Sequence, residues 1–174
     1  RDWSSDVCSS DLRNYGICNI PVDSWINARW QDGSVKWAAF SALIPKGVNA
    51  TTLKAGYGQH VKHKLVDISK NGITVNTGDM KVLFPRHGNS FMDYIIYKGI
   101  KVADMGRVVA STSLSSYKSV IDTSYIENSG DVRAVVRVNG HMIGDKESNM
   151  TLPFTLRFYL YYGSEQIRIQ HSFV

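Results

Sequence analysis

The chain has 174 residues, of which 43% are hydrophobic, and its 20 Lys and Arg against 15 Asp and Glu give a net charge of +5. This hydrophobic content is typical of a globular protein with a buried core. No apolar run approaches the roughly 18 residues that a membrane-spanning helix needs, so the sequence predicts no membrane span.

The positive charge would suit an acidic partner, either a nucleic acid or a polyanionic glycan. The basic residues are spread along the chain, however, and their densest group is only Lys62, His63 and Lys64. Solvated strand faces explain this spread more simply than a dedicated anion site. Because the tracking of phosphates needs a clustered basic stripe, we expect no nucleic-acid partner.

Residues 1–12 read RDWSSDVCSSDL and show neither a strand period nor a helix period. They lack the basic start and apolar run of a signal peptide, and a common short-read sequencing adapter gives the same letters when it is translated in one frame. We therefore predict that residues 1–12 are a disordered artefact on an unfinished metagenomic reading frame. At the other end, the alternating run 166–170 continues into His171 without a turn, so we expect an internal fragment of a longer protein. Cys18 is then the only remaining cysteine. One cysteine cannot form a disulfide within the chain, so the sequence does not indicate a redox compartment.

Glycine-containing turn signals recur at short intervals, and runs rich in β-branched and aromatic residues lie between them. This spacing is typical of an all-β sandwich or barrel, and no segment has the apolar period and paired caps of a helix. The predicted strands are Val35–Ile44, Gly72–Asn76, Met80–Phe84, Asp93–Tyr97, Val132–Val138 and Thr155–Tyr162. A domain boundary is expected in the glycine-containing stretch between Pro45 and Lys70.

The run ARWQDGSVKW, residues 28–37, predicts a β-hairpin that turns at Asp32 and Gly33. Glycine supplies the positive φ that a tight hairpin turn needs. A two-residue loop would place Trp30 opposite Val35.

Three tryptophans surround this turn, namely Trp25, Trp30 and Trp37. With a short turn, Trp30 and Trp37 would point to opposite faces of the hairpin. Together the three indoles could form a platform on which sugars stack. Burial in a core is the commoner role of tryptophan in a hairpin, and we regard Trp30, Asp32, Gly33 and Trp37 as a structural motif.

The segment ARWQDGSVKWAAFSALIP resembles the W-x-DGS-[VI]-[KR]-W segment near the end of the N-terminal barrel in exo-rhamnogalacturonan lyases and YetA-like proteins. The stretch NGITVNTGDMKVLFPRHGNSFMDYIIYKGIKVADMGRVV is similar to the segment that follows in that family. SGDVRAVVRVNGHM and LPFTLRFYLYYGSEQIRIQHSFV resemble its central β-sandwich. The resemblance runs from about Trp25 to Val174, with the motifs in the family's order.

The resemblance implies a partial RIFT-type barrel over residues 13–66 and a central antiparallel β-sandwich over residues 67–174, truncated at its C-terminus. It implies a large α/α toroid beyond this sequence, and a lyase that cleaves rhamnogalacturonan, the acidic polysaccharide of pectin, by β-elimination at galacturonate. A secreted or periplasmic location follows from the same resemblance. Because toroid lyases place much of their chemistry in the toroid, we expect this fragment to be a scaffold that is inactive alone.

β-Elimination needs a base for the proton α to the uronate carboxylate, and a cation or hydrogen-bond donors for the enolate-like intermediate. One predicted loop carries these groups and provides the candidate substrate-binding residues. Arg86 could bind a carboxylate through two hydrogen bonds, His87 could act near neutral pH, and Asn89 adds an amide. An ordinary polar turn is the commoner explanation of such a loop, and we expect the catalytic residues to lie outside the fragment.

No metal and no cofactor are expected. His60 and His63 have the only close histidine spacing, but they would face opposite sides of a strand and no cysteine or carboxylate joins them at ligand spacing. Phosphate-binding, dinucleotide-binding and serine-nucleophile motifs are absent from the sequence.

Two functions remain open. The favoured one is a scaffold in a carbohydrate-active enzyme that degrades an acidic pectic polysaccharide. The alternative is a non-catalytic β-sandwich of a cell-surface protein that binds glycans or serves as structure. A long helical region after Val174 would indicate the enzyme.

Overall fold

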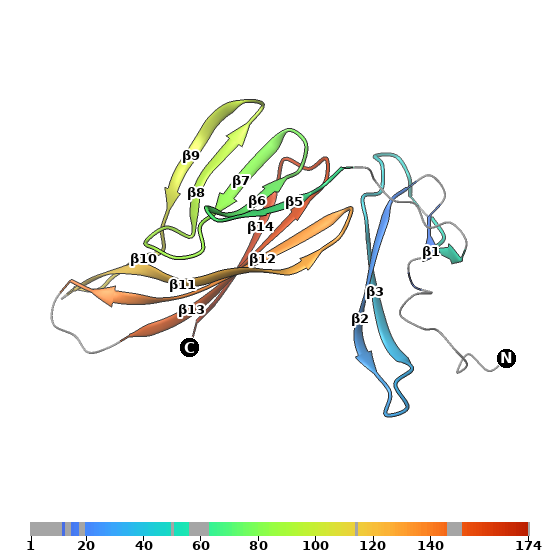
Figure 1. The fold of residues 1–174 in the computed structure, drawn as a ribbon, viewed down its shortest axis with the longest axis horizontal. Coiled ribbons are helices and arrows are strands. Elements are labelled where there is room, and N and C mark those ends of the chain that lie inside the picture. Colours follow the sequence, from blue (N-terminus) through green and yellow to red (C-terminus); the bar gives the residue numbers. More distant parts are fainter. Residues whose placement is uncertain are drawn as a thin grey trace. The chain divides into compact units, whose positions relative to one another are not determined.

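The structure is a computed structural model of the chain. It describes residues 12, 15–17, 20–49, 51–55, 63–113, 115–145 and 151–173. Every element in this part of the chain is a β-strand, which confirms the all-β prediction (Figure 1). Residues 1–11, 13–14, 18–19, 50 and 56–62 lie outside the described residues, and they include Cys18 and His60.

The chain divides into two compact units. Unit 1 comprises residues 1–63 together with 130–133, and unit 2 comprises residues 64–129 together with 134–174. The sequence predicted a domain boundary after residue 66, and the division between the units falls after His63.

Unit 1 contains two small antiparallel sheets. In the first, β1 (Tyr15–Gly16) pairs with β4 (Lys54–Ala55). In the second, β2 (Val22–Arg29) pairs with β3 (Val35–Ala42) and forms the predicted hairpin.

The β2–β3 loop is longer than the two residues that we predicted. Gly33 donates its N–H to the Trp30 carbonyl at 3.0 Å, and Trp30 donates its N–H to the Ser34 carbonyl at 2.9 Å. Val35 is paired with Arg29 rather than with Trp30. These bonds and the Gly33 φ of 87° define a type I turn closed by a glycine bulge, so Gly33 follows the turn and does not form its centre.

Asp32 accounts for the longer loop. Its Oδ1 accepts the backbone N–H of Ser34 at 2.9 Å and the Ser34 hydroxyl at 2.6 Å. The Ser34 hydroxyl and N–H hold the pKa of the Asp32 carboxyl below its usual value. An aspartate that bonds two residues ahead favours this turn over the tighter one, which the dipeptide signal alone did not predict.

A buried carboxylate organises the interior of unit 1. Asp23 on β2 is 8% exposed and accepts the N–H groups of Asp131, Val132 and Arg133 at 2.7, 2.9 and 2.6 Å. A Cβ at Gly130 would overlap that carboxylate, so glycine is needed beside it. These three bonds explain why residues 130–133 belong to unit 1.

Unit 2 contains two five-stranded sheets, in each of which strands that follow one another in sequence are neighbours. The strands of the first sheet are β5 (Val66–Ser69), β6 (Gly72–Asn76), β7 (Met80–Phe84), β8 (Met92–Tyr97) and β9 (Ile100–Gly106). The strands of the second sheet are β10 (Val109–Ser111), β11 (Ser116–Ser129), β12 (Arg133–Gly144), β13 (Leu152–Tyr161) and β14 (Ile167–Phe173). Order by sequence is what short antiparallel connections produce.

Strands with alternating apolar residues were predicted well, whereas a strand rich in polar residues was not predicted. The predicted bounds of β6 and β7 agree with the structure. The prediction missed β11, a 14-residue strand rich in serine and threonine whose buried positions include Ser119 and Ser124. Small hydroxyl side chains on its inner face conceal the period on which strand prediction depends.

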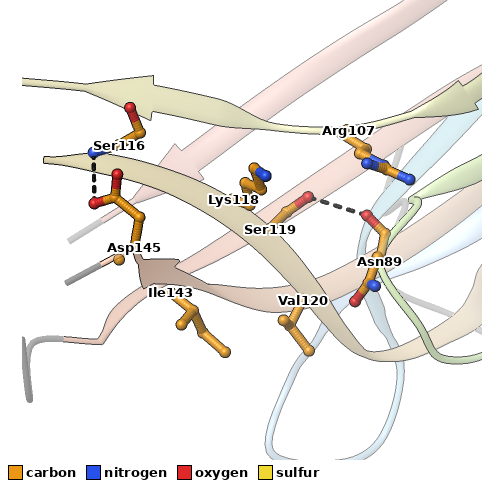
Figure 2. Close-up of a pocket in the computed structure, with 9 residues that line it drawn as sticks. Asn89, Arg107, Ser116, Lys118, Ser119, Val120, Ile143 and Asp145 are labelled. Carbon is orange, nitrogen blue, oxygen red and sulfur yellow. Dashed lines mark hydrogen bonds between the residues drawn. The ribbon is translucent and has the colours of Figure 1, made fainter. Parts of the chain in front are cut away.

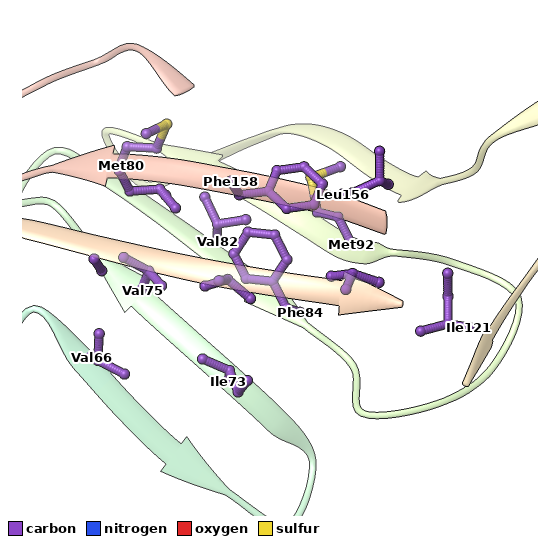
Figure 3. Close-up of a cluster of buried hydrophobic side chains, with 14 of the residues drawn as sticks. Val66, Ile73, Val75, Met80, Val82, Phe84, Met92, Ile121, Leu156 and Phe158 are labelled. Atoms are coloured by element: carbon purple, nitrogen blue, oxygen red, sulfur yellow. The ribbon is translucent and has the colours of Figure 1, made fainter. Parts of the chain in front are cut away.

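The core of unit 2 lies between its two sheets (Figure 3). Phe84 from the first sheet and Phe158 from the second are 0% and 1% exposed, and their ring centroids are 4.9 Å apart. Val75, Val82 and Leu160 are fully buried around them. Both sheets thus bury one face against the other, which defines a β-sandwich.

Among the described residues, no helix is long and apolar enough to cross a membrane.

Candidate functional site

The β7–β8 loop, which contains the predicted substrate-binding residues, runs along the edge of β11. Gly88 forms a bridge with Ile121, with N–H to O distances of 3.3 and 2.6 Å in the two directions. The Arg86 carbonyl accepts the Ser124 N–H at 3.1 Å. The loop backbone is therefore held in place like a short additional strand.

His87 is exposed, and its ring is oriented by the backbone of β11. Its Nδ1 lies 2.6 Å from the Asp122 carbonyl oxygen. Since a carbonyl only accepts, Nδ1 carries a proton in this bond, and Nε2 is the ring nitrogen left to accept or release a proton. The bond fixes the orientation of the ring, as proton transfer by a side chain requires.

A second histidine lies beside the same aspartate. His141 on β12 has Nδ1 at 3.0 Å from Oδ1 of Asp122, and is paired in register with Val120. Asp122 thus contacts His87 through its backbone and His141 through its side chain. Among the described residues, no group of three His, Cys, Asp or Glu side chains is placed to hold a metal ion.

A pocket of about 290 Å³ opens beside the loop (Figure 2). Its lining comes from the β7–β8 loop, the β9–β10 connection, β11 and the end of β12. The lining residues are Asn89, Arg107, Ser116, Lys118, Ser119, Val120, Ile143, Gly144 and Asp145. Of the three predicted residues, the structure brings only Asn89 to this pocket.

Strand register explains why these side chains share one face. Lys118 of β11 lies between Val109 of β10 and Ile143 of β12, and cross-strand partners project to the same side of a sheet. At the end of the pocket, Ser116 donates its N–H to Oδ1 of Asp145 at 3.0 Å.

The backbone around Arg107 is firmly placed. Val108 donates its N–H to the Ser119 hydroxyl at 3.1 Å and accepts the Ser119 N–H at 3.0 Å. Before Arg107, a Cβ at Gly106 would lie 2.8 Å from the Phe91 ring, and Met105 has a φ of 45°. A non-glycine residue in the left-handed region is uncommon and is enriched near functional sites.

The two cations of the pocket have no partner among the described residues. Within the described part of the chain, neither the Arg107 guanidinium nor the Lys118 ammonium makes a hydrogen bond or an ion pair. Asp145 is the one carboxylate in the lining, and Ser116 occupies one of its oxygens. The pocket therefore offers cationic donors, an amide, a carboxylate acceptor and apolar surface to a small polar ligand.

Sequence reasoning missed Arg107, Lys118 and Asp145. The only signal for Lys118 was the alternation of β11, in which Ser116, Lys118 and Val120 project to the outer face. Arg107 precedes β10 and Asp145 follows β12, and both reach the pocket because these strands pair with β11. The spacing of residues in the sequence does not predict this pairing.

The tryptophan motif of unit 1 is more exposed than we predicted. Trp30 and Trp37 are 55% and 63% exposed, so neither indole lies in a core of the described structure. The Lys36 ammonium lies 4.2 Å from the centroid of the Trp30 ring. Trp25 is partly buried, with the Arg133 guanidinium 3.8 Å from its centroid.

Family models match both parts of the chain. The PcRGLX-like N-terminal RIFT barrel domain matches residues 9–56, and the PcRGLX-like protein central beta sandwich domain matches residues 65–174. The chain therefore belongs to the PcRGLX-like family, and the resemblance to YetA-like rhamnogalacturonan lyases is confirmed. The order of a barrel domain followed by a β-sandwich is confirmed with it.

One curated relative is the "Uncharacterized protein YetA" of Bacillus subtilis (strain 168), which is 29% identical over 165 residues. The match covers 87% of this chain and 19% of that protein, so the chain spans about a fifth of the length of its relative.

The barrel match begins at residue 9, inside the segment 1–12 that we predict to be an artefact. Leu12, the last residue of that segment, is only 5% exposed, so it is packed and not disordered as we predicted. Residues 1–11 lie outside the described part of the chain, and their origin remains a prediction.

Proposed function

We propose that this chain is the barrel-and-sandwich part of a carbohydrate-active enzyme that degrades an acidic, rhamnogalacturonan-like polysaccharide by β-elimination. Its role is to support a catalytic α/α toroid that lies on another part of the polypeptide. The observation that carries this proposal is the consecutive match of the two PcRGLX-like domains, over residues 9–56 and 65–174. The short coverage of the YetA relative supports further domains in the parent protein.

The chemistry of the described residues agrees with a supporting role. His87 could accept a proton. Arg107 and Lys118, which could stabilise an enolate, line the pocket, whereas His87 does not. Among the described residues, His87 makes no hydrogen bond with either of these cations. Secretion or a periplasmic location belongs to the same proposal, because polymeric pectin is degraded outside the cytoplasm.

The test compares this chain with the full-length parent protein on rhamnogalacturonan. Ultraviolet absorbance of the unsaturated uronate product is expected to grow with the parent and to stay flat with residues 1–174. Growth with the 174-residue chain would move the catalytic base into it. Long-read sequencing through both ends of the source locus is needed to obtain the parent, and a frame that continues into a long helical region supports the enzyme.

A second candidate function is a non-catalytic glycan-binding module. The exposure of Trp30 and Trp37 favours it, because exposed indoles are the side chains on which sugars stack. A parent that continues into further β modules and lacks lyase activity would favour this candidate over the enzyme.

A further inference from the structure

We propose that the pocket between Asn89, Arg107 and Lys118 binds one uronate residue of an acidic glycan. The choice of a glycan rests on the proposed function, and the site itself rests on the geometry of the β10–β11–β12 face. The ligand carboxylate is bound by Arg107 and Lys118, and the ligand hydroxyls by Asp145 and Asn89.

The first argument is the state of the two cations. Arg107 and Lys118 line the same pocket, and no acidic group of the described residues pairs with either. Many other cations of unit 2 are paired, as Lys64 is with Asp67 and Lys101 is with Asp104. Two unpaired cations in one recess attract an anion, and the planar arginine fork suits a carboxylate.

The second argument is the charge balance of the pocket. The described lining residues include two cations and one carboxylate, Asp145, which sum to one net positive charge. This balance suits a monoanion such as a carboxylate better than a dianion such as a phosphate monoester. Asp145 keeps one oxygen that Ser116 does not use, and a carboxylate oxygen binds sugar hydroxyls well.

The third argument is the apolar part of the lining. Val120 and Ile143 lie between the polar groups, and Ile143 is 49% exposed. A pyranose ring has an apolar C–H face as well as hydroxyls, so a uronate can use both kinds of surface. The volume of about 290 Å³ is at the small end of ligand pockets and suits a single sugar residue.

The fourth argument is the preorganisation of the lining. Hydrogen bonds between Val108 and Ser119 fix the backbone next to Arg107 and Lys118. The Ser119 hydroxyl also donates to the Asn89 carbonyl at 3.4 Å, which links the β7–β8 loop to the same strand (Figure 2). A site whose backbone is fixed loses less entropy on binding.

The experiment is calorimetric titration of the full 174-residue chain with trigalacturonate, and with a neutral galactotriose of equal length. We expect binding of trigalacturonate only. Arg107→Gln and Lys118→Gln should each weaken it by roughly tenfold, the loss of one charge-assisted hydrogen bond. Lys81→Gln is the matched control, because Lys81 is an exposed lysine on β7 in the other sheet and should leave the affinity unchanged.

Several results would overturn the site. Unchanged affinity in both pocket variants, equal binding of galactotriose, or full displacement of trigalacturonate by equimolar inorganic sulfate would each do so. Lys118→Glu provides a second variant: it should abolish binding, and retained binding would also contradict the proposal. Circular dichroism of each variant checks that the sandwich is folded.

The outcome is separable from that of the proposed function. Binding that depends on Arg107 and Lys118, together with a parent that lacks lyase activity, supports the pocket and refutes the lyase. A parent that cleaves rhamnogalacturonan, together with pocket variants that bind normally, supports the lyase and refutes the pocket.

Discussion

The sandwich of unit 2 and the β2–β3 hairpin of unit 1 are both antiparallel β-structure with large aromatic side chains, but they bury these side chains very differently. Phe84 and Phe158 are at most 1% exposed, whereas Trp30 and Trp37 are more than half exposed. The difference in burial comes from what packs against the strands and not from the strands themselves. In unit 2 a second sheet covers each aromatic face, while the described part of unit 1 has no such layer over its hairpin.

The two units also differ in what holds them together. Unit 2 has a continuous apolar core, and unit 1 has few buried apolar side chains among its described residues, namely Leu12, Ile17 and Val132. A buried carboxylate with three backbone donors, Asp23, is the main polar anchor of unit 1. We therefore expect substitutions of core apolar residues to destabilise unit 2 most, and loss of the Asp23 hydrogen bonds to destabilise unit 1.

The chain allows each unit to be followed separately. The tryptophans of the described residues, at positions 25, 30 and 37, all belong to unit 1. Trp25 is the most buried of them, so a change in tryptophan emission reports unfolding of unit 1. Far-ultraviolet circular dichroism, to which unit 2 contributes most strands, reports unit 2.

The largest effect is expected in the sandwich core. Phe158→Ala should lower the free energy of unfolding of unit 2 by about 3–5 kcal/mol, because it leaves a cavity against Phe84. Phe173→Ala is the matched control: this side chain is 75% exposed, and its loss should cost less than about 0.5 kcal/mol. Similar losses in urea titrations of the two variants would show that the core is not where we place it.

The second effect concerns the polar anchor of unit 1. Asp23→Ala leaves one buried and two part-buried N–H donors without their acceptor and should destabilise unit 1 by about 1–3 kcal/mol in titrations followed by tryptophan emission. Gly130→Ala should act in the same direction, because its Cβ displaces the carboxylate.

The double variant sharpens this prediction. Asp23→Ala with Gly130→Ala should cost less than the two single losses added together, since both remove the same bonds. Asp104→Ala removes an exposed surface acid and is the control, with an expected change below about 0.5 kcal/mol. Full additivity of Asp23 and Gly130 would refute the anchor.

A smaller effect depends on pH. Arg157 donates Nε to Oε2 of Glu127 at 2.7 Å, and these hydrogen bonds lower the pKa of the Glu127 carboxyl in the folded state. The stabilisation is therefore complete above the pKa of an unfolded glutamate, and it is lost as the pH falls through the lower folded-state pKa. Glu127→Gln should remove that part of the acid dependence of unit 2 stability, at a cost of roughly 1 kcal/mol at neutral pH.

Asp67→Asn is the comparison for Glu127→Gln. Asp67 forms a pair with Lys64 in which both side chains are more than 60% exposed, at 64% and 75%, so its removal should change the pH profile less. A larger change for Asp67 than for Glu127 would contradict the prediction.

No effect is expected from the first residues. Deletion of residues 1–8 should leave the calorimetric midpoint unchanged, because we predict that they are translated adapter and they precede the matched barrel domain. Deletion of residues 1–12 also removes the buried Leu12 and should lower the midpoint. A drop of several degrees after the shorter deletion would refute the artefact.

Much of the fold was predictable from the sequence, and little of the site. The bounds of β6 (Gly72–Asn76) and β7 (Met80–Phe84) were predicted correctly, because apolar residues fill these strands and glycine-containing turns flank them. The pocket was not predicted because only the pairing of β10 with β11 brings Lys118 and Arg107 to one pocket, and the polar β11 gives no strong strand signal. The sequence-predicted loop at Arg86, His87 and Asn89 does border this face, although its function stays a prediction.

The most direct test of this account is the urea unfolding of residues 64–174 expressed alone, followed by circular dichroism. A scaffold with its own closed core should unfold in one cooperative transition, close to that of unit 2 in the full chain. A gradual, non-cooperative transition, or a soluble chain without strand signal, would contradict the claim that the sandwich is a self-sufficient support for a catalytic domain.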